Sequence, residues 1–307
     1  MSSPPPSTLL ITSASGKQAT ALLPLLAPLP TLSLRLAVHT TPSKHHLETL
    51  HPTAQVLQTD LTSPSALPAL LTGITTLLYI APTYHPHELA IGTALIATAL
   101  KTPGFAHFVY SSVLHPLLDG MPHHAAKRGV EKALVESGLR YTILQPTTFM
   151  DNLPIAAIAK MREPRFAATW GVENPFSWVA TGDLAQAMKT VVLGGERHFG
   201  ATYQIVGTRR PLSFGEAMGI VERKIGREVR VEVKKGREAV DALLVRLFGT
   251  VEGIDPRTVE LARGMVEYYD KRGIVGNSNV LEWLIGRDAM QFDEWVDGKL
   301  AELEGAN

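Results

Sequence analysis

Three histidines precede a lysine in the first half of the chain, and their side chains are of the types that acid–base chemistry uses. His115, His123 and His124 lie within ten positions of one another, and Lys127 follows them. An imidazole titrates near neutral pH, so it can donate or accept the proton that accompanies hydride transfer. We therefore expect His123 and His115 to be candidate catalytic groups, and surface or supporting roles for them stay open.

A metal site is the weaker interpretation of the same histidines. The only acidic residue near them is Asp119, and the chain contains no cysteine. Zinc sites usually combine histidine with thiolate or carboxylate ligands in a fixed geometry. We expect no metal site, and the lack of cysteine also excludes disulfides, iron–sulfur clusters and thiol nucleophiles.

The elements that must position these groups alternate between strand and helix. Short apolar runs bounded by turn residues are typical of strands buried on both faces. They are residues 9–12, 34–38, 55–58, 76–80, 108–111 and 141–144. Helix-length segments fall between them at residues 17–27, 65–71, 88–100 and 124–137. This alternation predicts an α/β fold with a doubly wound, parallel, Rossmann-type sheet.

The second half of the chain has a different pattern, with longer and more charged helical segments. The predicted helices are residues 183–193, 213–225, 257–271 and 279–285, and the predicted strands are residues 202–206 and 229–233. We expect a dinucleotide-binding domain over residues 1–152 and a smaller α+β substrate lobe over residues 153–307. The segment 176–206 is expected to return to the first domain.

The turn after the first predicted strand is the place where a dinucleotide loop is expected. Its sequence runs from Thr12 to Ala19, and Ser13, Gly16 and Ala19 occupy the three small-residue positions. Small residues allow backbone amides at a helix N-terminus to approach a pyrophosphate closely. The predicted cofactor contacts here are Thr12, Ser13, Ser15, Gly16, Lys17 and Gln18. An ordinary Ser/Gly turn is the alternative.

The end of the second predicted strand favours NADP(H) over NAD(H). An NAD site usually places a carboxylate against the ribose about 20 residues beyond the loop. Here the strand is followed by His39 and Thr40, and Lys44 comes shortly after. These side chains are able to donate hydrogen bonds to a 2′-phosphate. A solvated loop is the competing interpretation.

The overall charge gives no attraction to polyanions, because 29 basic residues balance 29 acidic ones. We expect neither a nucleic-acid partner nor binding to an anionic membrane. No basic residue precedes Lys17, and Pro24, Pro28 and Pro30 interrupt the uncharged stretch that follows it. The expectation is a cytoplasmic protein without a secretory signal or a membrane span.

A short basic cluster lies in the second half of the chain, at Lys234, Lys235 and Arg237. Glu232 and Glu238 flank it, so we expect solvated surface here rather than an anion site.

Seven segments in order make the chain similar to the NmrA-like family, whose members are atypical short-chain dehydrogenases/reductases. The loop, a Thr-Asp-Leu segment, a Ser-Ser strand end and a Gln-Pro strand end are among the matches. The matching segments are residues 11–19, 59–61, 109–113, 124–131, 141–152, 176–183 and 281–287. The resemblance covers nearly the whole chain and implies a Rossmann-type domain that binds NADP(H).

The resemblance also implies individual contacts. It places Asp60 and Leu61 near the adenine, and Ala81 and Pro82 against a cofactor ribose. The other implied cofactor contacts are Ser111, Lys127, Pro146, Thr147 and Phe149. We expect substrate contacts from Tyr84, Met150, Asn152, Trp170 and Phe248. Helix capping by Asp60 and a plain core position for Phe149 are the alternatives.

One feature of the superfamily is missing from this chain. Active members have a tyrosine four residues before the lysine, with a serine at the end of the preceding strand. Here His123 stands at the tyrosine position, and Ser112 is the candidate serine. We expect His123 to replace the phenol, with Lys127 holding the cofactor ribose.

The function that we predict is an NADPH-dependent oxidoreductase acting on a hydrophobic small molecule in a fungal polyketide pathway. A non-redox isomerase, cyclase or rearrangement enzyme that uses histidine acid–base chemistry is one alternative. A regulatory protein that senses NADP(H) without catalysis is the other. We expect a monomer or a homodimer.

Overall fold

The computed structural model describes residues 7–305, which divide into two compact units. Within the described residues, the first unit consists of residues 7–117, 125–145 and 184–203. The second consists of residues 118–124, 146–183 and 204–305.

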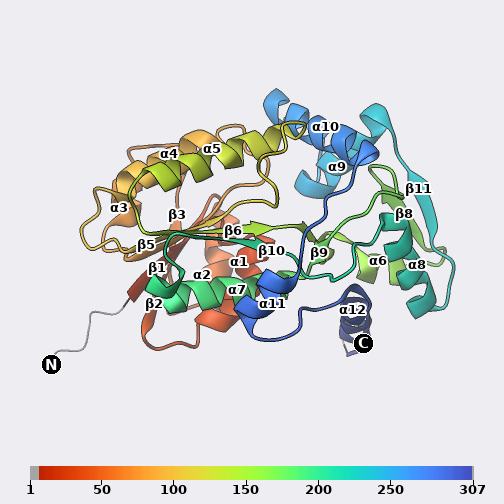
Figure 1. Cartoon of the computed structure of the whole chain (residues 1–307), viewed down its shortest axis with the longest axis horizontal. Helices are drawn as coiled ribbons and strands as arrows, with labels where there is room; N and C mark the ends of the chain where they lie inside the picture. Colours follow the sequence, from red (N-terminus) through yellow and green to blue (C-terminus); the bar gives the residue numbers. More distant parts are fainter. Residues whose placement is uncertain (1–6, 306–307) are drawn as a thin grey trace. The chain divides into compact units, whose positions relative to one another are not determined.

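The first unit is built on a seven-stranded sheet with the order β10-β6-β5-β4-β1-β2-β3 (Figure 1). The strands are β1 (Ser7–Ile11), β2 (Leu32–Val38), β3 (Gln55–Gln58), β4 (Thr76–Ile80), β5 (His107–Ser111), β6 (Tyr141–Pro146) and β10 (Ala201–Ile205). The pairs from β6 through β3 are parallel. The central strands β4 and β5 are buried along their whole length, which explains their mostly apolar sequences. The predicted doubly wound α/β fold is therefore confirmed.

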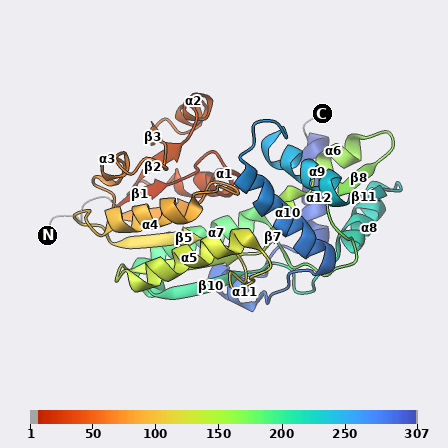
Figure 2. The same ribbon diagram turned by 90° about the horizontal axis from the view of Figure 1, so that it is seen from above.

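Helices cover both faces of this sheet (Figures 1 and 2). They are α1 (Lys17–Leu26), α2 (Thr41–Leu50), α3 (Leu67–Leu71), α4 (Glu88–Ala99), α5 (Pro122–Glu136) and α7 (Thr181–Gly194), followed by the 3₁₀ turn η2 (Gly195–His198). Helices α3, α4 and α5 lie on one face and bury their apolar sides against Tyr79, Phe108 and Tyr110. The rings of Tyr79 and Tyr110 stack with centroids 5.2 Å apart.

Helix α2 is a difference from the sequence analysis, which predicted no helix between the second and third strands. Thr40 caps α2 by accepting a hydrogen bond from the Ser43 amide at 3.3 Å, and Pro42 lies in the first turn. Leu47 is its one buried residue, so α2 has almost no apolar periodicity. A helix held by its cap and by little burial leaves only a weak signal in the sequence.

The second unit contains two small parallel sheets, one of β8 with β11 and one of β7 with β9. The strands are β7 (Thr148–Phe149), β8 (Arg165–Ala168), β9 (Trp178–Val179) and β11 (Arg230–Val233). The helices are η1 (Met150–Asn152), α6 (Ile155–Lys160), α8 (Phe214–Ile225), α9 (Gly236–Phe248), α10 (Pro256–Lys271), α11 (Asn279–Ile285) and α12 (Phe292–Gly305). The sequence analysis predicted α8, α10 and α11 but not α6, α9 or α12.

An aromatic cluster forms the core of the second unit. Trp178, Phe176 and Phe214 pack with ring centroids 4.7 to 6.3 Å apart, and Trp170 and Tyr269 extend the cluster. Helix α8 is well defined in the sequence because Ser213 and Glu216 form a capping box and Gly226 ends the helix in the left-handed conformation. Among helices in residues 7–305, none has both the length and the apolarity that crossing a bilayer requires.

Candidate functional site

The first unit places its candidate site where the strand order reverses, between β1 and β4. Thr12 follows β1, and its hydroxyl donates to the Ile80 carbonyl at 2.8 Å and accepts from the Ile80 amide at 2.9 Å. The hydroxyl of Ser13 donates to the same carbonyl at 2.9 Å. These bonds tie together the carboxyl ends of the two strands, and this crevice is where ligands of open α/β sheets bind.

The turn after Thr12 is shaped to receive an anion. Ser13 has a positive φ of 48°, and Gly16 is the N-cap of α1, with its amide donating to the Ser13 carbonyl at 2.9 Å. A Cβ atom on Gly16 would lie 3.2 Å from that carbonyl oxygen. No side chain of the described residues caps α1. The amides of its first turn are thus available for a pyrophosphate, and the turn fits a dinucleotide.

Gln18 connects this turn to the end of β5. Its Oε1 atom accepts a hydrogen bond from the Ser111 hydroxyl at 2.7 Å. The single proton of Ser111 is therefore used within the protein, and the hydroxyl keeps only its acceptor capacity for a ligand. Ser112, the next residue, is also buried.

Lys127 on α5 forms an ion pair with a carboxylate that the sequence analysis did not select. Its Nζ atom lies 2.7 Å from Oε1 of Glu88, and the Tyr110 hydroxyl donates to the same oxygen at 3.0 Å. Glu88 is 3% exposed, so its charge depends on these two donors. Burial raises the pKa of Tyr110, and the Glu88 charge raises it further, so this phenol stays protonated.

Glu131 lies one turn further along α5 and is held by Gln145 of β6. The amide of Gln145 donates to both carboxylate oxygens of Glu131, at 3.0 and 3.1 Å. Burial raises the pKa of Glu131, an effect that the Gln145 hydrogen bonds and the Lys127 charge oppose. This carboxyl group beside the strand end is a second ionisable group that the sequence analysis did not select.

Exposed polar side chains lie at the end of β2. His39 is exposed, Thr40 caps α2, and Lys44 lies 3.7 Å from Glu48 on the same helix. Residues 39–41 carry no carboxylate. An exposed i,i+4 ion pair contributes little, so Lys44 is free to change partners.

Asp60 accepts hydrogen bonds from the Thr62 amide at 2.9 Å and from its hydroxyl at 2.7 Å. These bonds lower the pKa of Asp60, which is therefore ionised at neutral pH. The neighbouring Leu61 lines a mostly apolar pocket of about 350 Å³ with Thr62, Pro64, His87, Ala90, Ile91 and Ala94. A ring system has room in this pocket.

Other predicted contacts lie beside these groups in the first unit. Ala81 and Pro82 are half-buried and directly follow β4. Tyr84 has a positive φ of 49°, and burial together with the Glu88 charge raises its pKa well above that of a free phenol. Ser15 is exposed in the turn before α1, and Lys17 is exposed at the first position of α1.

The remaining predicted residues belong mainly to the second unit. The Thr147 hydroxyl donates to the Ser177 carbonyl at 3.0 Å, and Phe149 is half-buried on β7. Met150 is fully buried, and Trp170 is 6% exposed within the aromatic cluster. Pro146 is buried at the end of β6, Asn152 ends η1, and Phe248 is exposed at the end of α9.

The histidines lie at the start of α5 and before it. His115 has a positive φ of 54° and is half-buried. His123 and His124 are buried, with ring centroids 4.5 Å apart at an interplanar angle of 85°. His123 and Lys127 are both on α5, one turn apart. Within residues 7–305, no three His, Asp or Glu side chains are grouped to hold a metal ion.

Glu88 had one signal in the sequence. It is the first charged residue after Asp60, at the end of a long uncharged stretch. A lone carboxylate in such a segment is either exposed or paired when buried. Its partners Tyr110 and Lys127 are 22 and 39 residues away along the chain, so only the folded structure identifies them.

A seven-stranded parallel sheet with an uncapped helix N-terminus at its switch point defines a Rossmann-type α/β fold. The chain belongs to the NmrA-like family, whose model matches residues 5–298. This confirms the family expected from the sequence segments.

Among curated proteins, the NAD(P)H azoreductase of Xenophilus azovorans is 30% identical over 252 residues, covering 80% of this chain and 83% of the relative. An NADPH-dependent quinone oxidoreductase of Escherichia coli has a similar fold, with a TM-score of 0.76 at 20% identity over 95% of this chain and 99% of the other. The negative transcriptional regulator NmrA in complex with NADP gives a TM-score of 0.75 at 17% identity, with coverage of 99% and 98%. The likeness to these two solved structures, at 20% and 17% identity, shows a shared fold.

Proposed function

We propose that this chain is an NADPH-dependent reductase of a hydrophobic small molecule. The observation that carries the proposal is the turn from Thr12 to Gln18, which presents the uncapped N-terminus of α1 at the switch point of the sheet. The azoreductase relative, at 30% identity over most of both chains, supports a reductase rather than another Rossmann-type activity.

The residues present fit a dinucleotide along the carboxyl edge of the sheet. The turn amides bind the pyrophosphate, and the apolar pocket beside Leu61 receives the adenine. His39 and Lys44 provide donors to a 2′-phosphate, whereas the Thr40 hydroxyl donates to the Ser43 hydroxyl at 2.9 Å. Residues 39–41 bring no carboxylate to repel the phosphate. These features support a preference for NADP(H) over NAD(H).

Lys127 is the cation that holds the cofactor ribose in this proposal. An ammonium group has three donors, and Glu88 accepts from it at 2.7 Å, which leaves donors for ribose hydroxyls. NADPH, when bound, supplies the hydride. The reduced substrate also needs a proton, and we assign its delivery to His123, with His115 as the second candidate.

Calorimetric titration of the cofactor-free protein with NADPH, NADP⁺, NADH and NAD⁺ tests the cofactor part of the proposal. We expect NADPH to bind at least tenfold more tightly than NADH. Equal affinities would overturn the preference, and no binding of any dinucleotide would overturn the cofactor assignment itself. The latter result would favour cofactor-independent histidine chemistry.

The reductase part of the proposal is tested by measuring turnover of a substrate. Quinones, azo compounds and enones are suitable first substrates, with NADPH consumption followed by absorbance. Tight NADPH binding with no turnover of any class would favour the sensor alternative. The fungal polyketide setting stays a prediction. Adding polycyclic quinones to the substrate screen would test it.

The role of His123 is tested by the pH profile of turnover rather than by its loss alone. We expect His123→Ala to lower kcat at least tenfold and to remove one ionisation from the profile, with NADPH affinity unchanged. His45→Ala, on exposed α2, is the matched control. An unchanged profile in His123→Ala would remove His123 from the mechanism and direct the same test to His115.

A further inference from the structure

A second strand-to-helix turn in the molecule has the features of an anion site. In the second unit, β8 and β11 are parallel neighbours, and their last residues, Ala168 and Val233, are paired. The two strands therefore end side by side. Thr169 follows β8, and Lys234 follows β11 and leads into α9. The Lys234 amide donates to the Ala168 carbonyl at 2.8 Å, so the two turns are held together.

Helix α9 begins shortly after β11 ends, so its first-turn amides lie near the ends of these two strands. Helix α9 has 13 residues, and Lys235, its N-cap, makes no side-chain capping bond. Gly236 has a positive φ of 54° before the helical residue Arg237. A left-handed residue followed by a right-handed one turns successive amides toward a common point, which is an anion-binding arrangement. The first-turn amides lack acceptors within the helix.

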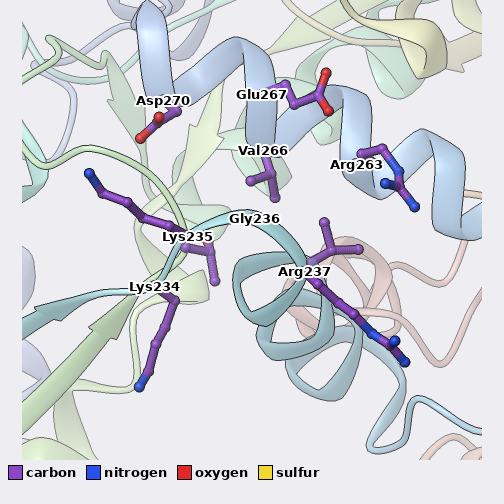
Figure 3. Close-up of a pocket in the computed structure, with 10 residues that line it drawn as sticks. Lys234, Lys235, Gly236, Arg237, Arg263, Val266, Glu267 and Asp270 are labelled. Atoms are coloured by element: carbon purple, nitrogen blue, oxygen red, sulfur yellow. The ribbon is translucent and has the colours of Figure 1, made fainter.

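A pocket of about 140 Å³ lies over this turn, between α9 and α10 (Figure 3). Four cations line it, Lys234, Lys235, Arg237 and Arg263, together with the two carboxylates of Glu267 and Asp270. Lys234, Arg237 and Arg263 each have an acidic neighbour 3.5 to 3.6 Å away. Lys235 pairs with none of the described residues, so its charge is available.

A buried hydroxyl gives the independent evidence for a ligand. Thr169 lines the same pocket and is 1% exposed. Its Oγ1 atom has no hydrogen-bond partner among the residues that the structure describes. A buried hydroxyl without a partner costs about 1 to 3 kcal/mol, so such groups are rare unless something binds to them.

The volume of the pocket and the two carboxylates that line it indicate which anion fits there. An engineered cavity of about 150 Å³ accommodates one benzene molecule, so this pocket suits one small anion and excludes a nucleotide. Glu267 and Asp270 accept hydrogen bonds but cannot donate them when ionised. Hydrogen phosphate retains a P–OH donor for such a carboxylate, whereas sulfate has none at neutral pH. We propose that the turn between β11 and α9 is a binding site for inorganic hydrogen phosphate.

The same need for a P–OH donor should distinguish inorganic phosphate from phosphate esters. A phosphomonoester has a second pKa of about 6, so at pH 7.5 it lacks the proton that inorganic phosphate retains. We expect inorganic phosphate to bind at least tenfold more tightly than sulfate or glycerol 3-phosphate at this pH. Glu267→Gln, which turns an acceptor into a donor, should reduce the preference over sulfate at least threefold.

Titration calorimetry of the full chain with inorganic phosphate at constant ionic strength tests the site. Thr169→Val and Lys235→Gln should each weaken phosphate binding at least fivefold. Lys132→Gln, whose side chain is exposed on α5, is the matched control and should leave phosphate affinity unchanged. Lys44→Gln is a separate variant that reports phosphate bound at the dinucleotide site. Because Thr169 Oγ1 is buried without a partner among the described residues, Thr169→Val should raise the thermal midpoint of the phosphate-free protein.

Three outcomes would overturn the proposal. They are the absence of saturable phosphate binding, equal affinity for phosphate and sulfate, and weakening by Lys44→Gln but not by Thr169→Val. The third outcome would assign phosphate to the dinucleotide site. All of these measurements are made without NADPH, so they are independent of the proposed reductase activity.

Discussion

The Nζ atom of Lys127 lies 2.7 Å from Oε1 of Glu88, and this contact links α5 to the first turn of α4. The side chain of Glu88 is 4% exposed and that of Lys127 is 17% exposed. A buried carboxylate that has lost its cation keeps the cost of desolvation without compensation. Glu88 therefore orients the lysine that the proposed reaction uses and depends on it for its own charge.

Glu88→Gln should destabilise the protein and disturb cofactor binding together. Removing one partner of a buried pair costs about 3 kcal/mol, so we expect a loss of about this size in the free energy of unfolding in urea. NADPH affinity should fall as well, because Lys127 loses the acceptor that fixes its direction. Glu136→Gln on the same helix is the control, since its pair with Lys132 is exposed and spans 3.9 Å. Equal stability of the two variants would contradict this account.

His39→Asp should change the cofactor preference. A carboxylate at the end of β2 accepts hydrogen bonds from an unmodified ribose and repels a 2′-phosphate. We expect the ratio of NADPH to NADH affinity to fall at least tenfold, measured by calorimetry. His51→Asp, at the other end of α2, adds the same charge away from the β2 end. A similar effect of both substitutions would indicate general electrostatics instead of direct recognition.

Sequence reasoning was most accurate for the first unit, for physical reasons. Strand β4 has the predicted bounds, because a strand inside a parallel sheet appears as a short apolar run between turn residues. Strand β3 also has the predicted bounds, although it is the edge strand and Val56 is its one buried residue. The turn between Thr12 and Gln18 was predicted because its place follows from the strand–helix junction. Helix α2 was missed, since polar residues fill its first turn and Leu47 is its one buried residue. Helix α9 buries four residues at helical spacing, but Lys235 makes no side-chain capping bond, so the sequence lacks a start signal for this helix.

The ionisable groups of the site were harder to predict. Lys127 was selected from its motif, whereas Glu88, Glu131 and Gln145 acquire their roles only through packing between distant segments. The basic cluster at Lys234 was interpreted as solvated surface from its acidic neighbours. The phosphate site that we propose departs from that interpretation because of the buried hydroxyl of Thr169, and no local pattern places Thr169 beside Lys234.

A buried histidine in β5 should make stability depend on pH. The Thr142 hydroxyl donates to the His198 carbonyl at 2.6 Å, so His107 Nε2 must be the donor in its 2.8 Å contact with Thr142. Nδ1 of His107 is buried without a partner among the described residues. Burial, reinforced by the charge of His198, lowers the pKa of His107 from 6.5 to about 4.

The sign of the pH effect follows from this lowered pKa. The unfolded chain takes up a proton on His107 below about pH 6.5, whereas the folded protein resists it until about pH 4. The stabilisation is complete above pH 6.5 and is lost as the pH falls toward 4. Between pH 7.5 and pH 5, His107 should account for about 2 kcal/mol of lost stability. His107→Asn should remove this share of the pH dependence in urea titrations, and His45→Asn, which is exposed, should not.

Gly273 lies where a side chain has no room. A Cβ atom on it would be 1.6 Å from the Pro175 carbonyl oxygen, and the adjoining residues form a bridge in which the Ser177 amide donates to the Ile274 carbonyl at 2.8 Å. Gly273→Ala must therefore move backbone against backbone, and we expect a loss of at least about 3 kcal/mol in the free energy of unfolding. Gly298→Ala is the matched control, because Gly298 lies within α12 with no atom within 4 Å of the added Cβ. Removing a glycine from a helix interior should stabilise the protein by about 0.5 to 1 kcal/mol, so the two variants are predicted to differ in sign. Equal midpoints in urea would show that the segment at Gly273 relaxes freely away from Pro175.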